Sequence, residues 1–210
     1  MEPERPPTCT AFAGTRRIAS GPLAEVAGAA QDAFHRDGST SVLVFDDASA
    51  ELIDLDFSLT VAELVERVTR AARAVAGAAA DDGPSLSAPR GPGRPRLGVV
   101  AREVTLLPRH WEWLNEQPGG ASVALRKLVE QARKVNEGRD RQRRAQEVAY
   151  RFMSAMAGNL PGYEEALRAL FAADRARFDE HLAAWPPDVR DYAVALAAAA
   201  FAPEPGVGRE

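Results

Sequence analysis

The sequence has one cysteine, three histidines and few aromatic residues. These low counts limit the kinds of disulfide, metal site and catalytic site that the chain can form. It contains 1 Cys and 3 His among 210 residues, with aromatic side chains at 7%. Cys9 alone forms no intramolecular disulfide, which favours a reducing compartment. The histidines His35, His110 and His181 share no metal-ligand spacing with one another or with Cys9. We therefore predict no metal site, no cofactor and no catalytic residue.

Long apolar runs and a secretory leader are also missing. The longest apolar run, Tyr192 to Ala202, is about half of the roughly 20 residues that a membrane-spanning helix needs. The start, MEPERPPTCT, has neither the basic nor the apolar region of a signal peptide. The abundant Ala and Arg suggest a GC-rich bacterial genome. We expect a cytoplasmic protein without a membrane partner.

Enzyme motifs are absent as well. No phosphate-binding glycine loop, nucleophile elbow or dinucleotide fingerprint occurs, and no small-molecule ligand is identifiable. An acidic group in a predicted hairpin, which could in principle hold a divalent cation, consists of Asp46, Asp47, Glu51, Asp54 and Asp56. Exposed charge on a hairpin is the commoner reading, so the sequence favours a protein that is not an enzyme.

Positive charge is concentrated in the middle of an otherwise acidic chain. Residues 84–144 carry 13 Lys and Arg against 6 Asp and Glu, whereas residues 1–83 carry 7 against 14 and residues 145–210 carry 6 against 10. The overall pI of about 5.5 does not reveal that residues 84–144 are basic. A clustered basic segment is the electrostatic footprint of nucleic-acid binding, which indicates a polyanionic partner.

The patterns predict an α+β fold with a small α+β N-terminal domain over residues 1–79. Its expected elements are a hairpin of 8–13 and 16–20, a helix from Pro22 to about Asp37, a second hairpin of 41–46 and 51–57, and a helix over 61–76 capped by Thr60. Residues 80–98 form an expected flexible basic linker. An all-helical region is predicted over 139–203 and a disordered tail over 204–210.

The region 99–138 has the order strand, helix, helix. We predict a strand from Arg102 to Leu106, a helix from Pro108 to Gln117, a break at Pro118-Gly119-Gly120, and a helix from Ser122 to about Asn136 that ends at Gly138. Alternation along the strand places Val104 and Leu106 toward the core. The second helix is expected to bury Leu125, Leu128, Val129 and Ala132.

The segment AREVTLLPRHWEWLNEQPGGASVALRKLVEQAR resembles the ribbon-helix-helix superfamily. That resemblance implies a homodimer whose paired strands enter the major groove of double-stranded DNA. It assigns base contacts to Arg102, Glu103 and Thr105. Glu103 fits only by accepting a hydrogen bond from a cytosine amino group, because its charge repels phosphates.

The resemblance also assigns DNA-backbone contacts to the start of the second helix. Gly120 lets the backbone approach, and Ser122 caps the helix whose free amides attract a phosphate. Arg126 and Lys127 are either phosphate contacts or a solvated face, and Ser122 is either an anchor or only a cap. A helix-turn-helix docking of the same segment remains open.

A shorter resemblance precedes this unit. Gly93-Arg94-Pro95-Arg96 is similar to the core of an AT-hook, in which Arg94 would enter a narrow minor groove. The alternative is a Pro/Gly linker with scattered arginines.

Two further segments, GVVAREVTLLPRHWEWLNEQPGGASVALRKLVEQAR and YRFMSAMAGNLPGYEEALRALFAADRARF, look like an uncharacterised bacterial family known as domain of unknown function 2239. That family implies no activity. The sequence as a whole predicts a dimeric DNA-binding protein, most simply a transcription regulator. The alternative is a protein-interaction adaptor in which the strand and helices only dimerise.

Overall fold

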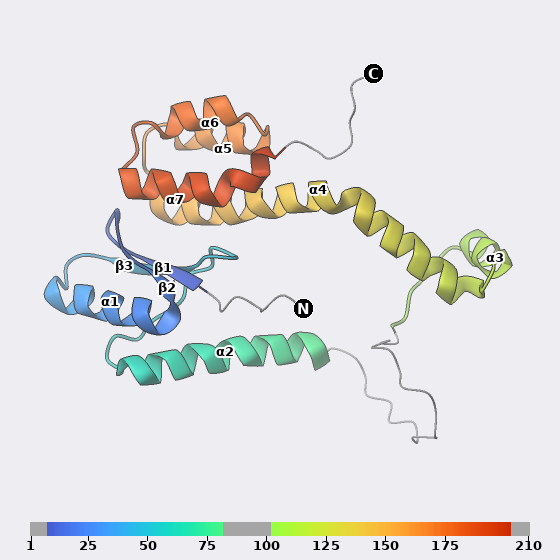
Figure 1. Cartoon of the computed structure of the whole chain (residues 1–210), viewed down its shortest axis with the longest axis horizontal. Coiled ribbons are helices and arrows are strands. Elements are labelled where there is room, and N and C mark those ends of the chain that lie inside the picture. The colour runs from blue at the N-terminus through green and yellow to red at the C-terminus, as the bar shows by residue number, and fades with distance from the viewer. Residues whose placement is uncertain (1–7, 82–101, 203–210) are drawn as a thin grey trace. The chain divides into compact units, whose positions relative to one another are not determined.

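The structure, a computed structural model, describes residues 8–81 and 102–202, with side chains over 8–71 and 102–202. Within these ranges it is a mixed α+β fold of one three-stranded antiparallel sheet and seven α-helices (Figure 1). The chain divides into two compact units, Met1–Arg70 with Glu137–Glu210, and Ala71–Asn136. The first unit joins the N-terminal and C-terminal parts of the chain.

The predicted first hairpin is confirmed. Strands β1 (Thr8–Ala13) and β2 (Arg16–Pro22) pair antiparallel, and Gly14 takes the positive φ of 58° that the tight turn requires. Helix α1 (Leu23–Arg36) follows, with Pro22 at its N-cap. Strand β3 (Val42–Asp46) pairs with the other edge of β1, which gives the order β2-β1-β3.

The second predicted hairpin forms only in part. Residues 51–57 meet β3 through an isolated bridge between Phe45 and Leu52, with Ile53 N–H donating to the carbonyl of Val44 at 2.8 Å. Beyond Ile53 no backbone bond joins the described segment to β3. The alternation at Ile53, Leu55 and Phe57 therefore reflects packing onto a hydrophobic cluster rather than a strand.

Helix α2 (Val61–Asp81) begins as predicted at Thr60. The Thr60 backbone N–H donates to Glu63 Oε2 at 2.8 Å, and the Glu63 N–H donates back to Thr60 Oγ1 at 3.4 Å. This is a capping box, which satisfies two amides at the helix start. The predicted pair of Glu66 and Arg70 is also present.

The C-terminal part is helical, as predicted. It contains α4 (Gly120–Ala157), α5 (Tyr163–Phe171), α6 (Arg175–Leu182), α7 (Pro187–Ala197) and a 3-10 turn η1 (Ala198–Phe201). Among the described residues, no helix is both long enough and apolar enough to cross a bilayer.

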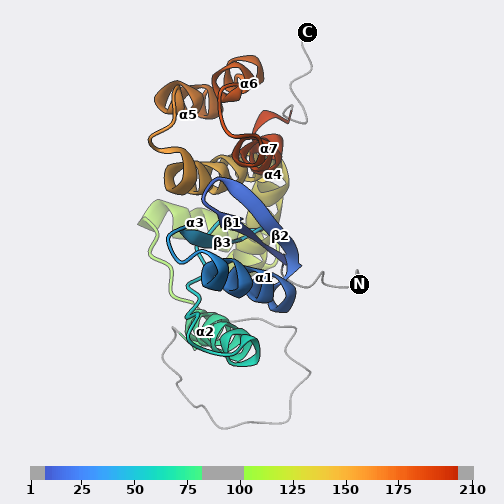
Figure 2. The same ribbon diagram turned by 90° about the vertical axis from the view of Figure 1, so that its left-hand side faces the viewer.

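Each face of the sheet has its own hydrophobic cluster, because side chains alternate along a strand. Cys9, Ala11 and Val44 pack with α1 on one face. Phe12 and Phe45 pack on the other face with residues of α4 and α7, so the sheet lies between helices (Figure 2). The ring of Phe152 in α4 lies 5.5 Å from that of Phe12, 5.1 Å from that of Phe45 and 4.7 Å from that of Tyr192. This aromatic cluster joins the two ends of the chain.

The predicted end of a helix at Gly138 is wrong, because α4 continues through this residue for 38 residues in all. One interior glycine costs about 1 kcal/mol relative to alanine. Ion pairs before and across Gly138 offset part of this cost, namely Glu130 with Arg133 at 3.5 Å and Glu137 with Arg141 at 3.0 Å. The burial of Ala149, Phe152 and Met153 holds the C-terminal half in place.

A polar network also crosses this core. Asp47 Oδ1 accepts hydrogen bonds from Thr10 Oγ1 and from Tyr192 Oη, both at 2.7 Å. The Thr10 hydroxyl also lies 2.9 Å from that of Ser20. Thr10 is buried, and no described buried side-chain N or O atom lacks a partner. The carboxylate of Asp47 therefore ties β1 to α7.

We expect Tyr192→Phe to lower the free energy of unfolding by about 1.5 to 3 kcal/mol, the usual contribution of a hydrogen bond to a charged group. Urea unfolding measures this. The control is Tyr163→Phe, which removes the exposed Tyr163 contact with Ser154 and should cost less than about 1 kcal/mol. Equal losses in the two variants would contradict the role given to Asp47.

The Cys9 thiol should make the fold sensitive to alkali. Burial, with Asp47 and Asp46 adding to its effect, raises the pKa of Cys9 from 9.0 to about 11. The neutral thiol therefore contributes stability that is complete below about pH 9 and lost as the pH rises through about 11. We expect the unfolding free energy, measured in reducing urea, to fall less between pH 8 and pH 11 in Cys9→Ala than in the wild type. Equal decreases in the unfolding free energy of the two proteins would contradict the role given to the Cys9 thiol.

Candidate functional site

The candidate site lies in the unit that contains helix α3 (Pro108–Glu116) and the first part of α4. Pro108 starts α3, since its fixed φ suits the first helical position. Gly119 and Gly120 have φ values of 89° and 72°, and the Gly120 N–H donates to the carbonyl of Gln117 at 2.8 Å. Two successive left-handed residues demand glycine, which explains the predicted Pro-Gly-Gly break.

The predicted strand from Arg102 to Leu106 is not formed within the chain. Residues 102–107 have no assigned secondary structure, and no strand of the described chain pairs with them. A strand exists only through pairing, and the described residues provide no strand for this segment to pair with. Val104, predicted to face a core, is 54% exposed. The exposed side chains of Arg102, Glu103 and Thr105 follow each other on this segment.

Ser122 is not the N-cap that the sequence predicted. Helix α4 begins at Gly120, two residues earlier. The carbonyl and the Oγ of Ser122 instead accept hydrogen bonds from Arg126, at 3.1 Å from Nε and 3.0 Å from Nη2. Ser122 thus orients the guanidinium of Arg126 near the start of α4. Arg126 and Lys127 are both exposed.

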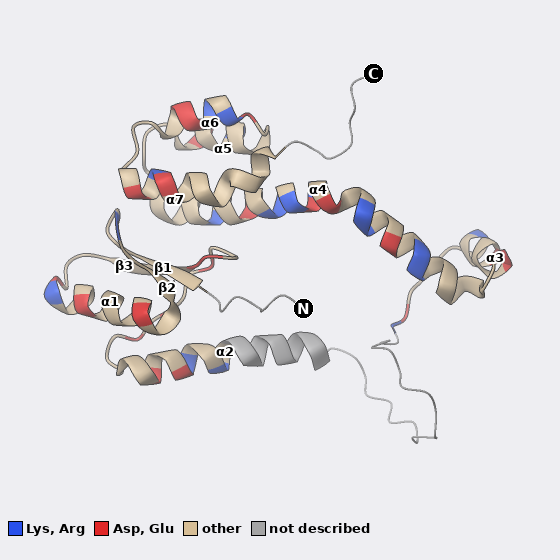
Figure 3. Ribbon diagram, viewed as in Figure 1, with Lys and Arg blue, Asp and Glu red and all other residues tan. Residues whose placement is uncertain are grey.

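The basic residues of α4 differ in their partners. Arg133, Arg141 and Arg143 pair within the helix with Glu130, Glu137 and Asp140, so blue and red alternate along it in Figure 3. Lys127 and Lys134 have no ion pair within the described part of the chain. Exposed pairs of this kind contribute little, and a phosphate can compete for their arginines.

Exposed apolar side chains gather in the same unit. The described chain exposes eleven large hydrophobic residues, and seven of them lie between residues 104 and 135: Val104, Leu107, Trp111, Trp113, Leu128, Val129 and Val135. Leu114 and Ala124 are the two buried hydrophobic residues in the described part of this segment. The predicted burial of Leu128 and Val129 is therefore not realised within one chain, since their exposed fractions are 43% and 57%.

Helix α3 presents its aromatic residues as the sequence predicted, on different faces. Leu114 is buried, Trp111 is 36% exposed and Trp113 is 50% exposed. His110 is exposed. Exposed tryptophans favour contact with another macromolecule, because they are among the residues most enriched at the centres of interfaces.

Arg94 and its AT-hook-like tripeptide lie outside the described residues. The acidic group of the predicted second hairpin is described in full, and four of its five carboxylates, those of Asp46, Asp47, Glu51 and Asp56, have separate partners. Asp46 accepts hydrogen bonds from the backbone of Ala48 and Ser49, and Asp56 pairs with Arg67 at 3.1 Å. Over the described ranges no three His, Cys, Asp or Glu side chains gather as metal ligands.

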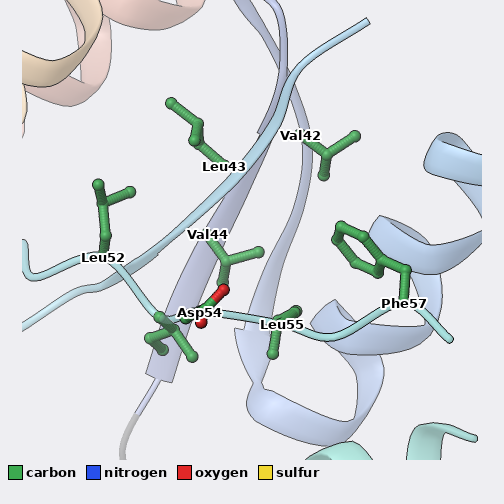
Figure 4. Close-up of a pocket in the computed structure, with 8 residues that line it drawn as sticks. Val42, Leu43, Val44, Leu52, Asp54, Leu55 and Phe57 are labelled. Carbon is green, nitrogen blue, oxygen red and sulfur yellow. The ribbon is translucent and has the colours of Figure 1, made fainter. Parts of the chain in front are cut away.

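A pocket of about 340 Å³ opens where residues 52–57 diverge from β3. Its lining is mainly apolar, from Val42, Leu43, Val44, Leu52, Ile53, Leu55 and Phe57, with the single carboxylate of Asp54 (Figure 4). Asp54 is the one ionisable side chain in this lining.

The sequence interpretation missed the continuous exposed stripe that extends to Val135. The available signal was the spacing of Leu125, Leu128, Ala132 and Val135, which alternates steps of three and four residues. That spacing is typical of a helix that packs along another helix.

Comparison with known proteins identifies a family and no activity. The family described as "Uncharacterized protein conserved in bacteria (DUF2239)" matches residues 8–197. No curated protein and no solved structure matches the chain.

We expect Leu114→Ala to destabilise α3, because Leu114 is buried and deleting a buried leucine costs about 2 to 5 kcal/mol. Limited proteolysis between residues 102 and 120 should become at least about tenfold faster, since cleavage follows the population of the opened state. Leu107→Ala is the matched control, because Leu107 is 49% exposed. Similar acceleration in both variants would show that Leu114 does not anchor α3.

Proposed function

Since the chain belongs to this bacterial family, whose description gives no activity, we propose from its own contacts that it is a homodimer that binds double-stranded DNA through residues 102–136. In this proposal the protein is not an enzyme, and a transcription regulator is its simplest role. The observation that carries it is the presence, in one short unit, of an uncovered apolar stripe and a group of exposed basic side chains.

The apolar residues support the dimer. A segment that exposes seven large hydrophobic residues and buries two has too small a core to be stable alone. Exposed apolar side chains along one helix face, such as Leu128, Val129 and Val135 of α4, mark an interaction site. A second copy would supply a cover for α4 and a pairing partner for residues 102–106.

The charges support DNA as the ligand. Arg126 and Lys127 extend from the first turns of α4, where the helix dipole and free amides already favour a phosphate. Gly120 is open, with nothing within 4 Å of a Cβ placed there, so a nucleic-acid backbone can approach. Arg102, Glu103 and Thr105 are then the residues proposed to read bases, as the ribbon-helix-helix resemblance implies, with Arg94 as a proposed minor-groove contact.

An adaptor that only dimerises or binds proteins is the second candidate. The intrahelical pairs of Arg133, Arg141 and Arg143 favour it, because they reduce the net field that α4 presents. The two candidates differ in their response to salt. DNA binding weakens steeply as salt rises, because bound phosphates release counterions.

Titration of the full chain with random genomic DNA fragments at several salt concentrations tests the proposal. We expect Arg126→Ala with Lys127→Ala to weaken binding to all sequences alike and to flatten the salt slope by about one to two units. Replacing Arg102 or Thr105 by Ala should instead cost about 1 to 3 kcal/mol on the preferred site.

The charge-matched control is Arg168→Ala with Arg177→Ala, which removes two exposed charges from α5 and α6. This control should leave affinity unchanged. If the Arg102 and Thr105 variants keep full discrimination while the Arg126 and Lys127 variant loses it, α4 reads the bases, as in a helix-turn-helix. Absence of wild-type binding at low salt would overturn the proposal in favour of the adaptor.

A further inference from the structure

Helix α4 has one face without charge between residues 121 and 138. The six charged residues of this stretch are Arg126, Lys127, Glu130, Arg133, Lys134 and Glu137. At 3.6 residues per turn they fall within an arc of about 120°. Leu125, Leu128, Ala132 and Val135 fill the opposite side, flanked by Val129, Gln131 and Asn136. The first four residues take the core positions a and d of a coiled-coil heptad, and the other three take the flanking positions e and g. None of the seven is charged.

This face is exposed where it is most apolar. The exposed fractions of Leu128, Val129 and Val135 are 43%, 57% and 73%. The ion pair of Glu130 and Arg133 lies on the charged arc, so it does not compete for the apolar face. Such a face fits another uncharged helix face, since a charged partner would be desolvated without a counter-charge. The described side chains of α4 provide such a face on a second copy, whereas the uncharged face of α2 packs through Leu64 and Val68 against the cluster that contains Cys9 and Val44.

Charge just beyond the face selects the direction of pairing. Arg139 takes the next core position, and residues 137–144 remain net positive, with four arginines against Glu137 and Asp140, which pair with Arg141 and Arg143. A parallel pair would place Arg139 against the same residue of its partner and bring the two basic stretches together. In an antiparallel pair these stretches lie roughly 35 Å apart at a rise of 1.5 Å per residue. That separation exceeds the Debye length of about 8 Å at physiological salt.

We propose that α4 pairs antiparallel with α4 of a second copy through the uncharged face, as a two-fold contact centred near Glu130 and Gln131. Leu125 then packs against Val135 of the partner subunit, and Leu128 packs against the partner's Ala132. Arg139 meets the partner's Ala121 rather than a like charge. The charged arcs of both helices face outward. This inference deepens the dimer of the proposed function by naming its contact, and it holds whether or not the dimer binds DNA.

Sedimentation equilibrium of the full chain at micromolar concentration is the first test. We expect a dimer for the wild type and a dissociation constant at least about tenfold higher for Leu128→Glu and for Val135→Glu. Lys134→Glu, next to Val135 but on the charged arc, is the control and should stay dimeric. Far-ultraviolet circular dichroism checks that each variant remains helical. A monomeric wild type, or folded variants that all dimerise like the wild type, would overturn the inference.

Disulfide mapping in a Cys9→Ala background tests the direction. Val129 lies beside the proposed two-fold axis, so Val129→Cys should crosslink with its own copy on oxidation, while Val135→Cys should not. A parallel pair would give the reverse result and overturn the antiparallel assignment. A crosslinked dimer that shows no salt-dependent DNA binding would support this inference while refuting the proposed function, so the two failures are distinguishable.

Discussion

The contact of Phe152 with Phe12, Phe45 and Tyr192 is the constraint on which the first unit depends. It joins a strand hairpin near the start of the described chain to helices near its end, and the Asp47 bonds to Thr10 and Tyr192 reinforce the same junction. Aromatic packing buries large apolar side chains at this junction, and the hydrogen bonds fix the orientation. Residues 71–136 consequently form an insertion between two halves of one unit.

The sequence patterns predicted those elements that are stabilised by residues close together in the chain. The hairpin at Gly14, the capping box of Thr60 and the helices after residue 145 are visible in the sequence because turns, caps and 3.6-residue periods are short-range signals. The pairing of β3 with β1 and the contact of Phe152 with Phe12 are not visible, since they depend on residues far apart in the chain. The passage of α4 through Gly138 depends on ion pairs and packing that outweigh the cost of one glycine.

The candidate site was predictable in composition but not in detail. Clustered basic residues and the Pro-Gly-Gly break were evident, whereas Ser122 oriented Arg126 instead of capping the helix. Residues 102–106 have strand-like alternation, yet a strand exists only through pairing, and no strand of the described residues pairs with them. Leu128 and Val129 are likewise exposed in the described chain. Both patterns are ones that the proposed dimer would bury.

The split first unit has a consequence for synthesis on the ribosome. One face of the sheet, with Phe12 and Phe45, is covered by residues of α4 and α7, which are translated much later. At about 5 to 20 residues per second, several seconds pass between the synthesis of the sheet and the synthesis of the helices that cover this face. During that interval only the α1 face has its packing partner. Early chaperone binding to residues 8–57, released once α7 emerges, is the behaviour that this order of synthesis favours.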